Sequence, residues 1–137
     1  FKLKEKIKFW LDKKGYAVND LGPKSYKEDD DYPKYLIPMI KNFRKEKDAV
    51  GFIFAGSGQG EAILCNKFKG VRAAVFYGKN QEIPKLARKH NDANILSIGC
   101  FFAKEMEIKR AIEDFLKTKF ANGRHKRRLK EFDKLGD

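Results

Sequence analysis

The sequence contains few of the features that mark membrane, secreted or metal-binding proteins. No apolar run approaches the roughly 20 residues that a membrane-spanning helix requires, and no signal-peptide pattern opens the chain. There are two cysteines, Cys65 and Cys100, and they lack the close spacing of a zinc site or a disulfide framework. We therefore expect a cytoplasmic protein with two buried thiols and no metal site.

Acidic residues are scarce relative to basic ones. The chain has 19 Asp and Glu against 31 Lys and Arg, which gives a formal net charge of +12. This charge attracts polyanions, but no recognition helix or aromatic-studded strand motif accompanies it. The lysines of residues 2–14 fit the solvated face of an amphipathic helix. Specific nucleic-acid binding is therefore the weaker interpretation, and phosphorylated small molecules are the preferred class of ligand.

Strands and helices alternate along the chain. Because 42% of the 137 residues are hydrophobic, one sizeable core can form, and we expect a single domain over residues 1–137. This alternation is typical of an α/β fold, in which helices cover both faces of a parallel sheet. Hydrophobic periodicity predicts helices at 1–14, 33–46, 61–69, 80–90 (with Ile83, Leu86 and Ala87 buried), 104–117 and 124–135, and strands at 16–21, 52–55, 71–76 and 95–98.

The most informative stretch is Gly56-Ser-Gly-Gln-Gly-Glu61, which follows the predicted strand 52–55. Its glycines let the backbone turn sharply and let an anion approach the N–H groups, and the positive end of the next helix would face the same loop. The stretch lacks the Gly-Lys-Ser/Thr of a Walker loop and the Gly-x-Gly-x-x-Gly of a dinucleotide loop. We expect an oxyanion or phosphate cradle at the carboxyl edge of the sheet, or else a tight turn without a ligand.

One carboxylate, Glu61, stands in the first turn of the helix after this loop. Beside a cluster of N–H donors it stays ionised, so it could act as a base next to a developing oxyanion. The alternative is a charge that only complements the helix dipole. The sequence leaves both interpretations open.

Six motifs occur in one order along the chain: Asp31-Tyr-Pro33, Gly56–Glu61, Asn66-Lys67, Gly70-Val-Arg-Ala-Ala74, Ala87–Asn94 and Gly123-Arg-His125 with Arg128. Together they resemble the type B ribose-5-phosphate isomerases and their relatives that isomerise galactose 6-phosphate and allose 6-phosphate. The resemblance covers essentially the whole chain. It implies a Rossmann-like α/β/α sandwich that works without metal or cofactor, as a homodimer or tetramer with active sites at the subunit interface.

The resemblance implies a base for aldose–ketose isomerisation. In this reaction a proton moves between C2 and C1 of the sugar through an enediolate, whose oxygens need hydrogen-bond donors. One branch of the family has a glutamate base at the position of Glu61, whereas another has a cysteine at the position of Ala55. Cys65 lies one helical turn further on, so we expect it to belong to the core.

The resemblance implies further roles. His90 matches the residue that opens the furanose ring, and Tyr32 matches a residue that lines the sugar pocket. The enediolate oxygens would be held by Gly56, Ser57, Gly58, Gln59, Gly60 and Asn91. The phosphate would be held, in the partner subunit's site, by Arg124, His125 and Arg128, of which the two arginines share a helical face. The plainer alternatives are a capping histidine, a packing tyrosine and a solvated basic helix.

The chain departs from the family in two places. Relatives begin with a central strand that ends in Asp-His-x-Gly, so we expect this sequence to be a fragment that lacks that strand. Phe101 stands where many relatives have an arginine for the phosphate. Taken as a whole, the resemblance still implies the interconversion of ribose 5-phosphate and ribulose 5-phosphate in the pentose phosphate pathway. The alternatives are a hexose 6-phosphate isomerase and a catalytically degenerate phosphosugar-binding relative.

Overall fold

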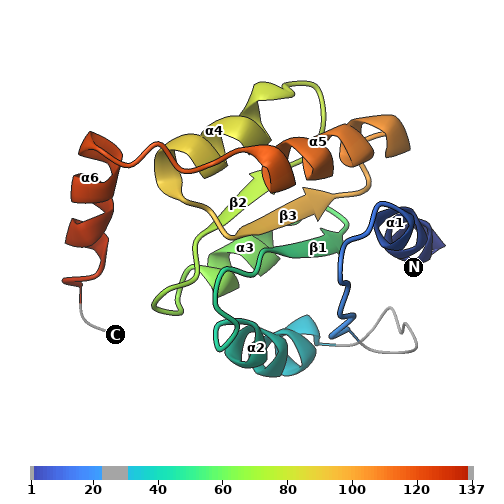
Figure 1. Ribbon diagram of the computed structural model, residues 1–137. Helices are drawn as coiled ribbons and strands as arrows, with labels where there is room; N and C mark the ends of the chain where they lie inside the picture. Colours follow the sequence, from blue (N-terminus) through green and yellow to red (C-terminus); the bar gives the residue numbers. More distant parts are fainter. Residues whose placement is uncertain (1, 23–30, 136–137) are drawn as a thin grey trace.

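The computed structural model of the protein describes residues 2–22 and 31–135. Within these residues three parallel strands form a sheet in the order β1-β3-β2, with helices on both faces (Figure 1). The predicted α/β fold is therefore confirmed. The strands are β1 (Gly51–Ala55), β2 (Ala73–Phe76) and β3 (Ile95–Gly99), and the helices are α1 (Lys2–Lys13), α2 (Tyr32–Phe43), α3 (Gln59–Cys65), α4 (Glu82–Asn91), α5 (Glu105–Lys117) and α6 (Arg124–Phe132).

The sheet separates two hydrophobic clusters. On one face, Leu96 and Ile98 of β3 pack with buried side chains of α1, α4 and α5. On the other face, Ile95 packs with buried side chains of α2 and α3. Successive residues of a strand point to opposite faces, so β3 contributes to both clusters. The three layers form the α/β/α sandwich that the resemblance implied.

β3 is the central strand of the described sheet. Every residue of β3 is buried, because it pairs with β1 on one side and β2 on the other. The apolar run Phe52–Ala55 fits a strand buried on both faces of a parallel sheet, but all of β1 is only half-buried. The runs Phe52–Ala55 of β1 and Ile95–Ile98 of β3 both lack a regular alternation of apolar and polar residues. Composition could therefore not tell the central strand from its neighbour.

The predicted strand at 16–21 is wrong. These residues are irregular and exposed; Val18, for example, is 42% exposed. A strand needs a neighbour for its backbone N–H and C=O groups, and no described segment supplies one here. The segment is attached through Asp20 instead, whose carboxylate accepts hydrogen bonds from Lys4 and Lys8 of α1.

The other predicted elements lie within a few residues of the observed ones, and Phe1 of the first predicted helix is outside the described residues. The predicted buried face of helix 80–90 is only partly right. Ala87 is buried, but Ile83 and Leu86 are 39% and 40% exposed, and Pro84 is buried instead. Both cysteines are free; Cys65 is fully buried as predicted, whereas Cys100 is only partly buried. None of the described helices is long and apolar enough to cross a membrane.

Candidate active site

The glycine loop lies at the carboxyl edge of the sheet, between β1 and α3, as the sequence predicted. Pairing between β1 and β3 continues into it: Cys100 N–H donates to the carbonyl of Ala55 at 2.7 Å, and Phe101 N–H donates to the carbonyl of Gly56 at 3.1 Å. The loop is therefore fixed to the residues that follow β3. Phe101 is 84% exposed, and its ring lies so close to Gly56 that an added Cβ there would be 2.7 Å from it.

Close packing requires glycine at two further positions of the loop. Gly58 has a φ of +78°, and a Cβ there would lie 2.9 Å from the Ser97 hydroxyl. A Cβ on Gly60 would lie 2.3 Å from the hydroxyl of Tyr32. The Tyr32 hydroxyl therefore lies against the loop at Gly60, the residue before Glu61. Part of the glycine content thus serves internal packing, which the sequence did not indicate.

Glu61 lies in the first turn of α3 and is half-buried. Within residues 2–22 and 31–135, no Lys, Arg or His forms an ion pair with it, so the carboxylate is not neutralised there. Burial and the neighbouring charge of Glu61 raise the pKa of the Cys65 thiol to about 11. Cys65 is therefore protonated near neutral pH and unsuited to act as a base, because the thiolate is the reactive form.

A second group of predicted site residues gathers where α4 ends and α6 begins. His90 and His125 stack, with ring centroids 4.3 Å apart and planes inclined by 13°. The backbone joins the same segments, since Ala121 N–H donates to the carbonyl of Lys89 at 2.9 Å. Asn91, the last residue of α4, is exposed beside them.

The histidine stack lies in a positive environment. Desolvation lowers the pKa of His125, and the positive charges of His90, Arg124, Arg128 and Lys89 lower it further. Arg124 and Arg128 are exposed, and neither forms an ion pair within the part of the chain that the structure describes. Their guanidinium groups are available to an anion. The neutral imidazole of His125 is favoured as long as no anion is bound.

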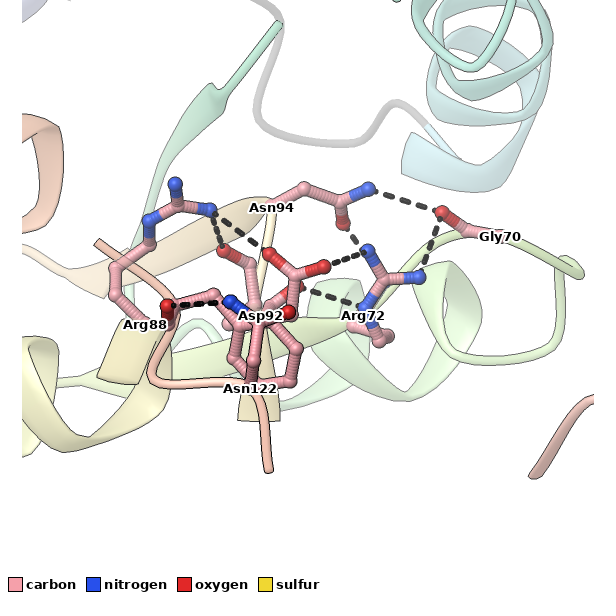
Figure 2. Close-up of polar contacts among 8 residues, drawn as sticks. Gly70, Arg72, Arg88, Asp92, Asn94 and Asn122 are labelled. Atoms are coloured by element: carbon pink, nitrogen blue, oxygen red, sulfur yellow. Dashed lines mark hydrogen bonds and ion pairs between the residues drawn. The ribbon is translucent and has the colours of Figure 1, made fainter. Parts of the chain in front are cut away.

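A polar network fixes the end of α4 (Figure 2). Asp92 adopts a left-handed conformation with a φ of +46°, and its carboxylate lies between two guanidinium groups, 3.4 Å from Arg72 and 3.7 Å from Arg88. Arg72 also donates from Nε to the Asp92 carbonyl at 2.7 Å, and Arg88 donates to the Ala93 carbonyl at 2.6 Å. The turn that follows His90 and Asn91 is therefore held from both sides.

Asn94 extends this network to the loop before β2. Its side-chain oxygen accepts from Arg72 N–H at 2.8 Å, and its side-chain nitrogen donates to the Gly70 carbonyl at 2.9 Å. Arg72, Asp92 and Asn94 belong to the sequence motifs, but the sequence predicts no role for them. A short run of Asn and Asp between a helix and a strand is the available signal, but Arg72 lies 20 residues from Asp92, and Gly70 lies 24 residues from Asn94.

The two groups of site residues lie at opposite edges of the sheet. The glycine loop follows β1 at the carboxyl edge, whereas the turn after α4 precedes β3 and is at the amino edge. In Figure 1, α6 lies beyond the amino edge, and the strand arrows point away from it. One chain therefore brings Ser57, Tyr32 and Glu61 to one edge and His90, Asn91 and His125 to the other.

A cavity of about 1040 Å³ lies between α6 and the amino edge. Asn91 and Lys126 line it, together with apolar side chains of α6 such as Leu129 and Phe132. Phe132 is 58% exposed and Leu135, just after the helix, is 75% exposed. Lys130 lines the same cavity, so this face of α6 carries both apolar and basic side chains, and the described residues leave it open.

The chain resembles proteins of known name over most of its length. A model of the family described as Ribose/Galactose Isomerase matches residues 1–132. A probable ribose-5-phosphate isomerase B of Mycoplasma genitalium is 36% identical over 93% of this chain and 83% of its own length. A ribose-5-phosphate isomerase B of Mycolicibacterium paratuberculosis is 35% identical over 94% of this chain and 80% of its own length.

Solved structures agree with these similarities. The crystal structure of the M. genitalium isomerase with bound ribulose-5-phosphate superposes with a TM-score of 0.89 at 34% identity, over 97% of this chain and 87% of that one. The ribose 5-phosphate isomerase of Thermotoga maritima gives a TM-score of 0.87 at 35% identity, over 98% of this chain and 91% of that one. Fold and sequence therefore point to the same family.

Proposed function

Because the chain belongs to the ribose/galactose isomerase family, we propose that it is an aldose–ketose isomerase that interconverts ribose 5-phosphate and ribulose 5-phosphate. The observation that carries the proposal is the likeness, over nearly the whole chain, to an isomerase solved with bound ribulose-5-phosphate. The catalytic domain would comprise residues 1–137, and the expected location is the cytoplasm, where phosphorylated sugars are metabolised.

Glu61 is the proposed base. It takes the proton from C2 of the open-chain aldose and returns it to C1, while the hydroxyl proton passes from O2 to O1. The negative charge that develops on the oxygens is stabilised by the Ser57 hydroxyl and by backbone N–H groups of the glycine loop, Gly56, Gly58, Gln59 and Gly60. The proposal is supported by the absence of a cationic partner for Glu61 among the described residues, since an ion pair would compete with proton abstraction.

The remaining groups would come from a second copy of the chain. In our proposal His90 moves the proton that opens the furanose ring, Asn91 donates to a substrate oxygen, and Arg124, His125 and Arg128 bind the phosphate. These residues lie at the amino edge, away from the glycine loop of the same chain. We propose a homodimer, alone or paired into a tetramer, in which the amino edge of one copy faces the carboxyl edge of the other. The exposed apolar side chains of Phe132 and Leu135, at the end of α6, support this arrangement.

A hexose 6-phosphate isomerase is the second candidate. The observation that favours it is Phe101, which puts an exposed aromatic ring rather than a cation beside the glycine loop. Rates measured side by side on ribose 5-phosphate, allose 6-phosphate and galactose 6-phosphate distinguish the two. We expect kcat/KM to be highest on ribose 5-phosphate, and a higher value on either hexose would replace the first candidate by the second.

The proposed base is tested with Glu61→Gln and a matched control, Glu82→Gln. Glu82 also lies in the first turn of a helix, α4, so it shares the dipole-complementing role without the glycine loop. Loss of a general base should lower kcat by about 10²- to 10⁴-fold in Glu61→Gln and leave KM nearly unchanged. Glu82→Gln should keep full turnover. Equal, small effects of the two substitutions would show that Glu61 only complements its helix.

A further inference from the structure

Ser97 is the one fully buried polar side chain among the described residues. It stands in the middle of β3, where it pairs with Ile53 of β1 and Val75 of β2. A buried hydroxyl is costly unless it is hydrogen-bonded, and Ser97 donates to the Gly58 carbonyl at 2.7 Å. The central strand is thus joined to the glycine loop through a side chain that the proposed mechanism does not use.

On the face of β3 that carries Ser97, the side chains become smaller toward the glycine loop. The side chains on this face are Ile95, Ser97 and Gly99, in order of decreasing size. A Cβ on Gly99 would lie 2.6 Å from the Ser57 carbonyl oxygen, and a Cβ on Gly58 would lie 2.9 Å from the Ser97 hydroxyl. The loop therefore lies directly on the carboxyl half of β3, with Ser57 over Gly99 and Gly58 over Ser97.

The peptide group between Gly58 and Gln59 is held at both ends. Its carbonyl accepts from Ser97 at 2.7 Å, and its N–H, on Gln59, donates to the Ser57 hydroxyl oxygen at 3.3 Å. In a trans peptide the C=O and N–H groups point in opposite directions, so fixing one fixes the other. The Ser57 oxygen is used as an acceptor inside the loop, which leaves its proton for a donor bond to another group.

A chain of hydrogen bonds thus runs from the interior of the sheet to the exposed Ser57. Adjacent bonds in such a chain polarise one another, and each orients the next. Without the Ser97 hydroxyl, the Gly58 carbonyl would keep a single, longer bond, from Ala62 N–H at 3.2 Å. The peptide plane could then rotate, and Ser57 would lose the donor that fixes its hydroxyl direction.

We propose that Ser97 is a positioning residue for the reaction: by holding the Gly58–Gln59 peptide, it aims the Ser57 hydroxyl at the enediolate oxygens. This inference rests on the proposed function of the glycine loop. Ser97 does not touch the substrate. Its effect on catalysis passes through the Gly58–Gln59 peptide and Ser57.

The test compares Ser97→Ala with Thr118→Val. The Thr118 hydroxyl also donates a hydrogen bond to a backbone carbonyl. Its acceptor is Asp114, at 2.6 Å, and the bond lies at the end of α5, away from the glycine loop. Alanine fits the space of Ser97, so the variant should fold. One misdirected oxyanion donor should lower kcat about tenfold, with KM changed less than about threefold, whereas Thr118→Val should change kcat less than about twofold. Equal effects on kcat would overturn the proposal, because they would show that only stability was lost.

A double-mutant cycle tests the route through Ser57. If Ser97 acts by aiming that hydroxyl, Ser97→Ala should cost much less once Ser57→Ala is present, about twofold instead of tenfold. Fully additive effects would overturn the proposal.

Amide hydrogen exchange gives a readout that does not depend on activity. The exchange rate of the Gln59 amide should rise at least about tenfold in Ser97→Ala and stay unchanged in Thr118→Val. Unchanged exchange at Gln59 would contradict the positioning role whatever the enzyme acts on. If the wild-type protein isomerises no sugar phosphate, the proposed function is wrong. The exchange result would still test whether Ser97 holds the Gly58–Gln59 peptide.

Discussion

The two edges of the sheet are held in place by different physical means. At the carboxyl edge, the glycine loop is fixed by shape, because its backbone lies against Ser97, Gly99 and Tyr32 at distances that leave no room for a Cβ. At the amino edge, the end of α4 is fixed by charge, through the ion pairs of Asp92 with Arg72 and Arg88. The first edge should therefore respond to added volume, and the second to ionic strength and pH.

The largest effect is expected from added volume at the carboxyl edge. In Gly58→Ala, the left-handed backbone and the contact with Ser97 both oppose the new methyl group, so the free energy of unfolding should fall by about 2–4 kcal/mol. The control is Gly70→Ala, which has a similar φ of +84° but nothing within 4 Å of the added Cβ. When both variants are unfolded in urea, Gly70→Ala should lower the free energy of unfolding by only about 1–2 kcal/mol. Equal losses would mean that the loop does not lie tightly on β3.

A smaller, salt-dependent effect is expected at the amino edge. Asp92→Asn keeps a residue that tolerates the left-handed conformation but removes the charge between Arg72 and Arg88. Because Asp92 is 37% exposed, solvent screening limits the loss of unfolding free energy to about 1 kcal/mol, and 1 M NaCl should reduce it further. The control Glu131→Gln breaks an exposed pair with Lys134 and should cost less than about 0.5 kcal/mol. If the loss of unfolding free energy in Asp92→Asn did not change with salt concentration, it would contradict the electrostatic account of this edge.

The smallest effect concerns pH at the histidine stack. The pKa of His125 is lowered in the folded protein, so the unfolded chain takes up the proton first as pH falls. The contribution of His125 to stability is complete above its unfolded pKa of about 6.5 and is lost progressively below it. Wild-type stability should therefore fall more between pH 7.5 and 5.5 than that of His125→Gln. An NMR titration of His125 with a midpoint at or above the ordinary value would contradict this prediction.

Local patterns predicted the carboxyl edge better than the amino edge. The glycine loop was found because an apolar run breaks directly into glycines, and both features are local in sequence. The strand at 16–21 was wrong because pairing depends on a neighbour, which alternation cannot reveal. The Asp92 network was missed because Arg72 and Asp92 are 20 residues apart. The importance of Ser97 was also hidden, although a lone hydroxyl in the apolar run Ile95–Ile98 was visible as a signal.

The separation of the site into two edges could have been read from chain order. In a parallel sheet, residues after a strand lie at the carboxyl edge and residues before a strand lie at the amino edge. Glu61 follows β1, and His90 precedes β3. A single chain with this order cannot bring them together, which is why the proposed site requires a second copy.

Mixing two inactive variants tests this central claim most directly. Glu61→Gln disables the glycine loop, and Arg124→Ala with Arg128→Ala disables the proposed phosphate-binding edge. In the control mixture, Glu61→Gln is combined with Ser57→Ala, both on the same edge, and no activity should be gained over the average of the parents. After subunit exchange, half of the dimers of the first mixture are mixed and each has one intact site, so isomerase activity should return to about one quarter of the wild-type value. A first mixture that stays as inactive as its parents would contradict a site shared between two copies.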